Sequence, residues 1–402
     1  MKKIAAGLLI LFLLITSSSL FLTTPAQGIP PLPPDPCSGV TEIPLTECNA
    51  LVSLYTSTNG SSWTIRTDWL VTSTPCSWYG VTCSAGHVQQ IFLGTNGLSG
   101  GLPAAIGFLT ELEVLNLGEN QIDGTIMLEL GNLSKLQNLF LNSNQLSGSI
   151  PTVLGSLLNL QQINLGSNQL TGSIPSELGN LTNLEWLNLE NNQLNGGLPL
   201  ELGSLVKLQF LNIAKNQLSG PIPNQLGDLT NLEGLDVSNN AFVGEVPAAI
   251  KQLSKLKILD TQFDYNGLYA TDPTVAAFLT SKDPNWSTNQ TIAPANLQAA
   301  PSAEGVRLTW TPIPYSEGGG YYEIGCSTTL TGTYTIKGLT ADKNAPSYTI
   351  NGLNPNSIYY FRLRTFTPKH DVQQNDLWSA YAYSSGVKTY TKLFLPQVLK
   401  QP

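Results

Sequence analysis

The sequence predicts two folded modules: a solenoid with a parallel β-sheet on its concave face and an irregular or 3₁₀-helical convex side, followed by an all-β sandwich. Three observations support this architecture. A 24-residue unit recurs seven times from Val88, four cysteines cluster before the first unit, and apolar residues alternate with polar ones after residue 294. A unit of this length buries its apolar face only against neighbouring copies, and alternation is typical of strands.

The chain begins with a segment that predicts export. Two lysines precede the apolar run Ile4–Ile15, and small residues up to Ala26 permit cleavage, so residues 1–26 are interpreted as a signal peptide. The alternative is an uncleaved membrane anchor. The polar residues Thr16–Ser19 interrupt the run before it reaches a full span, so we expect no membrane span in the mature chain and a secreted or cell-surface location.

A spacer and a cap separate this segment from the repeats. Residues 27–36 are rich in proline and predict an extended spacer, and residues 37–87 predict an N-terminal cap held by disulfides. A short helix is expected over Glu47–Thr56. Three large apolar fillers are expected in the cap: Trp63, Trp69 and Trp78.

Five cysteines are an odd number for a disulfide framework. Four lie in the cap and allow three pairings, of which the sequence-local one joins Cys37 to Cys48 and Cys76 to Cys83. The fifth, Cys326, lies in an alternating apolar stretch without basic neighbours, so we expect a buried, unreactive thiol. The alternative is a reactive or intermolecular thiol.

Residues 88–255 contain the seven repeats, of which LQNLFLNSNQLSGSIPTVLGSLLN is the third. Alternation at positions four and six, as in Leu139 and Leu141, predicts a short strand with one buried face. Position nine is Asn and position thirteen is Gly in every copy. The Asn amide can bond turn backbone groups, Gly permits the turn, and Pro at position sixteen opens a return segment on the opposite side.

The repeat pattern decays after Leu256. Residues 256–286 predict a partial eighth repeat and a C-terminal cap, with a helix over Thr274–Ser281 laid across the last coil and Trp286 as an apolar plug. The two caps are expected because a solenoid exposes an apolar cross-section at each end.

The stretch LSGSIPTVLGSL resembles the plant-type subclass of the leucine-rich repeat family, and CSWYGVTC is similar to the cysteine-pair cap that precedes such repeats. The resemblance covers residues 47–286 and implies an α/β-type leucine-rich repeat solenoid. It also implies protein or peptide binding. Met127 stands where Pro is expected, and Ile250 with Lys251 where Leu-Gly is expected, so the backbone is expected to vary locally there.

A second module is predicted over residues 294–390, after a linker at 287–293. Five stretches with strand alternation are GVRLTWTPI, YYEIGCST, TYTIKGL, SYTINGL and SIYYFRLRTFT. VRLTWTP and YTINGLNPNSIYYFRLRT resemble parts of a fibronectin type III domain, an immunoglobulin-like sandwich. This places Trp310 in the core and Leu353 and Tyr359 in a corner. Residues 391–402 are expected to be an unstructured tail, with a cell-surface signal as the alternative.

The sequence offers no constellation for catalysis. His87 and His370 lack neighbours at metal-ligand spacing and are expected in solvated loops, and no phosphate loop or nucleophile motif occurs. We therefore expect no enzyme, no cofactor and no metal. Only 11% of the residues are charged and the net charge is −8, so we also expect no nucleic-acid partner.

The outward positions of the repeats predict a binding surface. Trp186 and Phe210 occupy position three on adjacent strands, so their rings should be exposed and about 5 Å apart. Phe140 occupies position five, as does Phe92 two repeats earlier, and Glu190 and Lys215 lie on the coils of Trp186 and Phe210. The binding-site hypothesis comprises five residues: Phe140, Trp186, Glu190, Phe210 and Lys215. The alternative is that these are scattered surface side chains without a ligand.

We therefore predict an exported, non-enzymatic recognition protein that binds a protein or peptide partner through its repeat surface. Two alternatives belong to other classes. One is a cell-surface structural or adhesion protein without a discrete ligand. The other is an accessory binder of extracellular polysaccharide, for which a glycan would be the partner. The sequence favours no oligomeric state.

Overall fold

The computed structural model describes residues 36–390. The predicted signal peptide, the spacer up to residue 35 and the tail at 391–402 lie outside this range. Between residues 36 and 390, none of the helices combines the length and hydropathy that a bilayer crossing requires.

The N-terminal cap contains helix α1 (Leu45–Ser57), the 3₁₀ turns η1 (Gly60–Ser62) and η2 (Pro75–Ser77), and strand β1 (Val81–Ser84). The helix confirms the expected one and extends it by a residue or two at each end. Disulfides join Cys37 to Cys48 and Cys76 to Cys83, which is the sequence-local pairing. The three predicted fillers are all buried: Trp63, Trp69 and Trp78.

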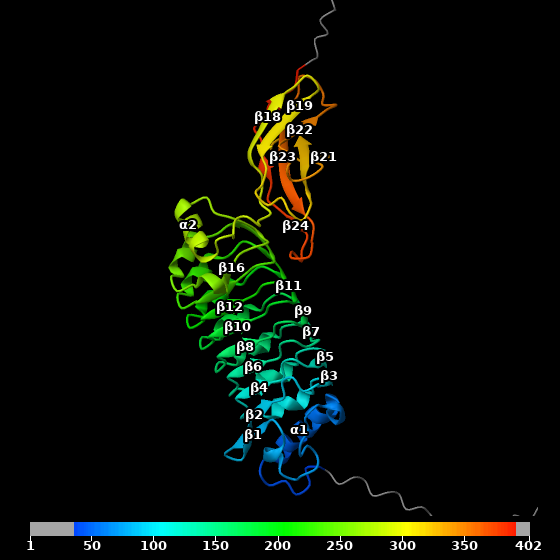
Figure 1. The fold of residues 1–402 in the computed structure, drawn as a ribbon, viewed down its shortest axis with the longest axis vertical. Coiled ribbons are helices and arrows are strands. Elements are labelled where there is room, and N and C mark those ends of the chain that lie inside the picture. The colour runs from blue at the N-terminus through cyan, green and yellow to red at the C-terminus, as the bar shows by residue number, and fades with distance from the viewer. Residues whose placement is uncertain (1–35, 391–402) are drawn as a thin grey trace, which may run out of the picture. The chain divides into compact units, whose positions relative to one another are not determined.

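The concave sheet of the solenoid has nine strands, stacked in chain order in Figure 1. β1 pairs with its neighbour antiparallel, and all other pairs are parallel. After β1 its strands are β2 (His87–Phe92), β4 (Val114–Asn116), β6 (Asn138–Phe140), β8 (Gln162–Asn164), β10 (Trp186–Asn188), β12 (Phe210–Asn212), β14 (Gly234–Asp236) and β16 (Thr261–Gln262). The register joins equivalent repeat positions, so each outward column runs straight across the sheet.

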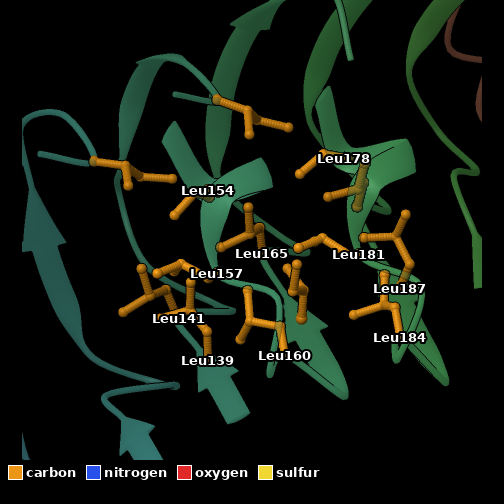
Figure 2. Packing of buried hydrophobic residues seen from close by; sticks show 14 of the residues in the cluster. Leu139, Leu141, Leu154, Leu157, Leu160, Leu165, Leu178, Leu181, Leu184 and Leu187 are labelled. Carbon is orange, nitrogen blue, oxygen red and sulfur yellow. The ribbon is translucent and has the colours of Figure 1, made fainter. Parts of the chain in front are cut away.

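The apolar positions of neighbouring coils form one continuous core. Figure 2 shows Leu139, Leu141 and Leu157 of one coil directed into the same interior as Leu165 and Leu187 of the next two. All five side chains are buried, and the core extends from the cap to Trp286. The predicted inward positions are therefore confirmed.

A ladder of asparagine side chains connects the coils. In Asn168, Nδ2 donates to the carbonyl oxygens of Leu141 in the preceding coil and of Leu165 in its own, while Oδ1 accepts the N–H of Leu146. The same pattern recurs at successive ninth positions. At the first coil the cap replaces the missing neighbour, because Asn96 bonds both the N–H and the carbonyl of Ile65. The amide thus satisfies backbone groups that the turn would leave unpaired.

A second set of parallel strands follows the asparagine in each coil and was not expected from the sequence. Positions ten to thirteen read Gln-Leu-Ser-Gly or similar, and only the Leu points inward. The strands are β3 (Ser99–Gly101), β5 (Gln121–Asp123), β7 (Ser147–Ser149), β9 (Gln169–Gly172), β11 (Gln193–Gly196), β13 (Gln217–Gly220), β15 (Ala241–Glu245) and β17 (Gly267–Tyr269). One inward apolar position per coil is too short a pattern to separate from a turn.

The convex side consists of 3₁₀ helices, as predicted. They are η3 (Ala104–Phe108), η4 (Leu128–Asn132), η5 (Thr152–Ser156), η6 (Ser176–Asn180), η7 (Leu200–Ser204), η8 (Asn224–Asp228) and η9 (Ala248–Gln252). Met127 has φ −75° and ψ 150°, close to the values of Pro151, so its substitution does not alter the backbone there.

The glycine at position twenty fits against the following coil. A Cβ at Gly155 would lie 2.3 Å from the carbonyl oxygen of Glu177, so a side chain cannot be accommodated. Lys251 occupies this position in the last full coil. There the following segment is helix α2 (Pro273–Lys282), and the Lys251 ammonium reaches Thr274 at 2.7 Å and Asp272 at 3.5 Å. The departure from the repeat therefore coincides with the end of the 3₁₀ helices on the convex side.

The eighth coil is more complete than its sequence indicates. Asn266 makes the ladder bonds to Val237 and Phe263, and Gln290 takes the place of a ninth asparagine by accepting the N–H of Leu268. Helix α2 includes the predicted Thr274–Ser281, and the Trp286 plug is buried.

The C-terminal module contains two antiparallel sheets with one shared core. One sheet has β18 (Ala295–Pro301), β19 (Val306–Thr311) and β22 (Ser347–Ile350); the other has β20 (Tyr321–Ser327), β21 (Thr335–Leu339), β23 (Ile358–Thr367), β24 (Leu377–Trp378), β25 (Ala382–Tyr383) and β26 (Val387–Lys388). The five expected strands are present, while β18 and the three short C-terminal strands were not predicted. Trp310 is buried, and burial raises the pKa of the Cys326 thiol.

Candidate functional site

Two aromatic side chains form the centre of the candidate site. Trp186 on β10 and Phe210 on β12 are directly opposite each other in the parallel register. Their ring centroids are 4.8 Å apart and the planes are inclined by 37°. Trp186 is 39% exposed, while Phe210 is only partly exposed. Both rings lie on the concave side of the sheet, because successive residues of a strand point to opposite faces and the next residue of each strand points into the core.

Gly234 on β14 continues the same column, and the Phe210 ring leans over it. A Cβ at Gly234 would lie 2.7 Å from Cδ1 of Phe210. Any side chain at this position would displace the ring. The glycine therefore sets the tilt of the aromatic pair towards the C-terminal coils.

An insertion in the eighth coil builds the wall beyond this glycine. Asn266, the ladder residue, is ten positions after Leu256, whereas Asn240 is eight positions after Leu232. The 3₁₀ turn η10 (Ile258–Asp260) accommodates the two extra residues and leaves Leu259 90% exposed. An exposed leucine beside two aromatic rings is typical of an interaction surface.

Together these residues enclose a hollow of about 220 Å³. Its outward-facing side chains come from four strands and η10: Trp186, Asn188, Phe210, Asn212, Asp236, Leu259, Asp260 and Gln262. The spacing of Leu256 and Asn266 was the sequence signal that could have revealed Leu259 and Asp260. Gly234 and Asp236 carry no such signal, because they occupy ordinary repeat positions.

The two charged residues of the hypothesis, Glu190 and Lys215, pair with each other instead of lining the hollow. Their Nζ and Oε1 atoms are 2.8 Å apart, and Glu190 also accepts a hydrogen bond from Asn212 at 3.0 Å. This pair holds the Asn212 amide at the edge of the hollow. The Glu190–Lys215 pair thus positions a residue that lines the hollow but does not itself line it.

A second ion pair lies on the other side of the aromatic rings. Lys257 pairs with Glu233, and its Nζ is 6.0 Å from the centroid of the Phe210 ring. The hydrogen bond between the two groups lowers the pKa of Glu233 and raises that of Lys257. Both side chains are therefore charged at neutral pH and already matched to each other.

Phe140 does not join the aromatic pair. It lines a separate hollow of about 500 Å³ towards the N-terminal end of the same sheet, together with Tyr79 and Phe92. Polar side chains also line it: Thr95, Asn116, Glu119, Asn142 and Asn164. The aromatic residues of the hypothesis therefore lie in two separate hollows and do not form one continuous site.

Comparison with known families identifies the repeating unit. The model of the leucine-rich repeat N-terminal domain matches residues 44–84, and leucine-rich repeat models match residues 111–133, 134–194, 207–229 and 231–253. The repeats are leucine-rich repeats. The cap with its disulfide pairs is accordingly a leucine-rich repeat N-terminal domain.

Several solved structures are similar to part of the chain. A TDR receptor is 37% identical, with 43% of this chain and 30% of that chain covered and a TM-score of 0.41. The Arabidopsis receptor kinase HAESA, in complex with the peptide hormone IDA and the co-receptor SERK1, is 34% identical, with 50% and 33% covered and a TM-score of 0.46. PEPR1-AtPEP1 is 30% identical, with 59% and 37% covered and a TM-score of 0.48. The match spans about a third of the length of each of these chains.

Both histidines have specific partners: His370 lies in a loop, as expected, whereas His87 lies on a strand with its side chain 41% exposed. His87 lies on β2, and its Nδ1 is 2.6 Å from Oε1 of the buried Glu47 in α1. This hydrogen bond raises the pKa of His87. His370 Nε2 is 2.5 Å from the hydroxyl oxygen of Tyr315. The histidines thus connect structural elements, and within residues 36–390 no group of three or more potential metal ligands occurs.

An acidic residue of the last leucine-rich repeat has the most perturbed carboxyl near the concave face. Asp264 accepts a hydrogen bond from Asn289 at 3.2 Å. Burial, with a smaller contribution from Asp283, raises its pKa from 3.8 to about 6. The unfolded chain releases this proton near pH 3.8. The carboxyl therefore stabilises the folded state to its full extent below that pH, and this stabilisation is lost as the pH rises through about 6.

We expect Asp264→Asn to raise the free energy of unfolding at pH 7.5 by about 1–2 kcal/mol, after allowance for partial exposure to solvent. The amide keeps an acceptor for Asn289 and removes the buried charge. At pH 3.5 the variant and the parent should be equally stable, as measured by urea unfolding. The exposed Asp228→Asn is the control. An equal difference at both pH values would contradict the assignment.

Proposed function

We propose that this protein is a non-enzymatic recognition protein that binds a peptide or an extended protein segment on the concave face of its leucine-rich repeats. The observation that supports this most directly is the hollow formed by Trp186, Phe210 and Leu259. Rigid aromatic side chains provide large contact area at little cost in conformational entropy, and they are over-represented among residues that dominate binding energy.

The straight outward columns support an extended ligand. Equivalent positions of successive strands are about 4.8 Å apart, and the register keeps them aligned from β2 to β16. A peptide crossing the strands would meet a polar amide surface on both sides of the aromatic pair, where Asn188, Asn212 and Gln262 offer donors and acceptors. Such a surface fixes the ligand's position while the aromatic pair supplies affinity.

We also propose that the protein acts outside the cell. The two disulfides of the cap require an oxidising compartment. The fibronectin-like character of the C-terminal sandwich remains part of this proposal, with the buried Trp310 and Tyr359 in support. In this proposal the leucine-rich repeats bind the ligand, and the C-terminal sandwich takes no part in binding it.

The test is the double variant Trp186→Ala/Phe210→Ala. Peptides selected on the parent protein from a random display library should bind it in isothermal titration calorimetry. The double variant should lose about 30- to 1000-fold in affinity, which corresponds to about 2–4 kcal/mol for the aromatic anchor. The circular dichroism spectrum should remain unchanged, because neither ring belongs to the core.

Phe108→Ala is the matched control, since Phe108 is 61% exposed on the convex helix η3. It removes an exposed aromatic ring from the opposite side and should leave peptide affinity unchanged. Selected peptides that bind the double variant as tightly as the parent would contradict the concave site. A library that yields no binding peptide at all would contradict the function itself.

A further inference from the structure

The hollow beside the aromatic pair contains charged side chains of one sign only. Asp236 and Asp260 both line it, and no lysine, arginine or histidine does. Asp260 is exposed at the end of η10, while Asp236 is partly buried at the floor. The two carboxylates therefore flank the apolar surface of Phe210 and Leu259.

The nearest cations do not neutralise these carboxylates. Lys215 bonds Glu190 and Lys257 bonds Glu233, and neither lysine forms an ion pair with Asp236 or Asp260. Within the described part of the chain, the Asp236 carboxylate is hydrogen-bonded by Ser238 alone, whose backbone N–H donates to Oδ1 at 2.9 Å and whose hydroxyl also interacts with the carboxylate. The carboxylate at the floor of the hollow has no ion-pair partner among residues 36–390 and can accept a further hydrogen bond from a ligand.

Burial raises the pKa of Asp236, and the Glu190 carboxylate contributes in the same direction, while the hydrogen bonds from Ser238 and the charge of Lys215 partly oppose this rise. A carboxyl in this environment gains from a nearby positive charge, because the charge offsets the loss of hydration. A cationic group of a ligand at the floor of the hollow would therefore favour the ionised form of Asp236.

The remainder of the concave face has the same sign. The outward positions of the eight coils carry Glu113, Glu119, Glu185, Glu190, Glu233, Asp236, Asp260 and Asp264, against the lysines Lys215 and Lys257. Both lysines belong to ion pairs already described. The field over the sheet is consequently negative, which attracts cationic ligands and repels anionic ones.

We infer that the ligand is a basic peptide, with an aliphatic or aromatic side chain seated over Gly234 between Phe210 and Leu259, and an adjacent arginine or lysine facing Asp236 and Asp260. The inference rests on the proposed function and adds the chemical class of the partner. An apolar side chain alone would leave both carboxylates without a counter-charge. A cation alone would leave the leucine and the rings in contact with water.

Peptide display on the parent protein, followed by titration of synthetic variants, tests this inference. Selected sequences should be enriched in arginine or lysine next to an aliphatic or aromatic residue. In a selected peptide, Arg replaced by Gln should weaken binding at least about tenfold, as expected for a charge-assisted hydrogen bond. The affinity of the arginine peptide should fall as salt is raised from 0.05 to 0.5 M, while that of the glutamine peptide should not.

Asp236→Asn distinguishes a specific contact from general attraction. The amide oxygen can still accept the N–H of Ser238, so the turn is kept. The ratio of the affinities of the arginine and glutamine peptides should fall close to one. Glu113→Gln is the matched control, because Glu113 lies in the coil next to that of β2, far from the hollow. This variant should leave the arginine preference intact.

The outcomes separate the inference from the function on which it rests. Neutral or acidic selected peptides that depend on Trp186 and Phe210 would overturn the basic ligand and retain the concave site. An arginine preference that persists in Asp236→Asn would also overturn the inference. Binding that survives the loss of both aromatic rings would refute the concave site instead.

Discussion

Replacement of Asn192 by Ala should lower the free energy of unfolding by about 3–5 kcal/mol. Its Nδ2 donates to the carbonyls of Leu165 and Leu189, and its Oδ1 accepts the N–H of Leu170. Asn192 is only 8% exposed, so water cannot replace these bonds fully. Each buried backbone group left without a partner costs about 1–3 kcal/mol.

Urea unfolding followed by circular dichroism measures this effect. Gln193→Ala is the control, because Gln193 is adjacent and exposed and makes no side-chain hydrogen bond within residues 36–390. It should change stability by less than about 0.5 kcal/mol. A loss below about 1 kcal/mol in Asn192→Ala would show that the ladder contributes little to coil stacking.

Replacement of Trp69 by Ala should destabilise the protein by a similar amount, about 3–5 kcal/mol. The ring centroid of Trp69 lies 4.9 Å from that of Trp63 and 4.9 Å from that of Trp78, and its Nε1 donates to the carbonyl of Tyr79 at 2.9 Å. The substitution removes the centre of the aromatic cluster in the core of the cap.

Thermal unfolding and amide hydrogen exchange would locate the damage. We expect the cap and the first coil to lose protection before the central coils, because each coil of a solenoid depends on its neighbours. Val71→Ala is the control, since Val71 is 82% exposed in the same cap. Uniform loss of protection along the solenoid would contradict this view of the cap as a local seal.

The solenoid could be predicted in detail because one physical requirement repeats. Leu139 and its equivalents must be buried in every coil, and Asn168 and its equivalents must close the same turn in every coil. The same residue pattern therefore recurs seven times, and each copy supports the interpretation of the others. The second set of strands was missed for the opposite reason. Each coil has one inward side chain at or just before this strand, such as Leu170, and the strand gains its regularity only from pairing with neighbouring coils.

The candidate site was predictable in part. The contact of Trp186 with Phe210 follows from register, because equivalent positions of parallel strands are adjacent. The involvement of Leu259 does not, since a leucine near the start of a repeat is ordinarily a core residue and only the insertion turns it outward. The pairing of His87 with Glu47 joins residues 40 apart in sequence, which no local pattern indicates.

Lys251 has a consequence for reading chains of this kind. A glycine at position twenty is needed where the 3₁₀ helix of the next coil approaches closely, so a bulky residue there marks the coil whose convex neighbour is no longer a 3₁₀ helix. In this chain that neighbour is helix α2, while the concave sheet continues for one more strand, β16.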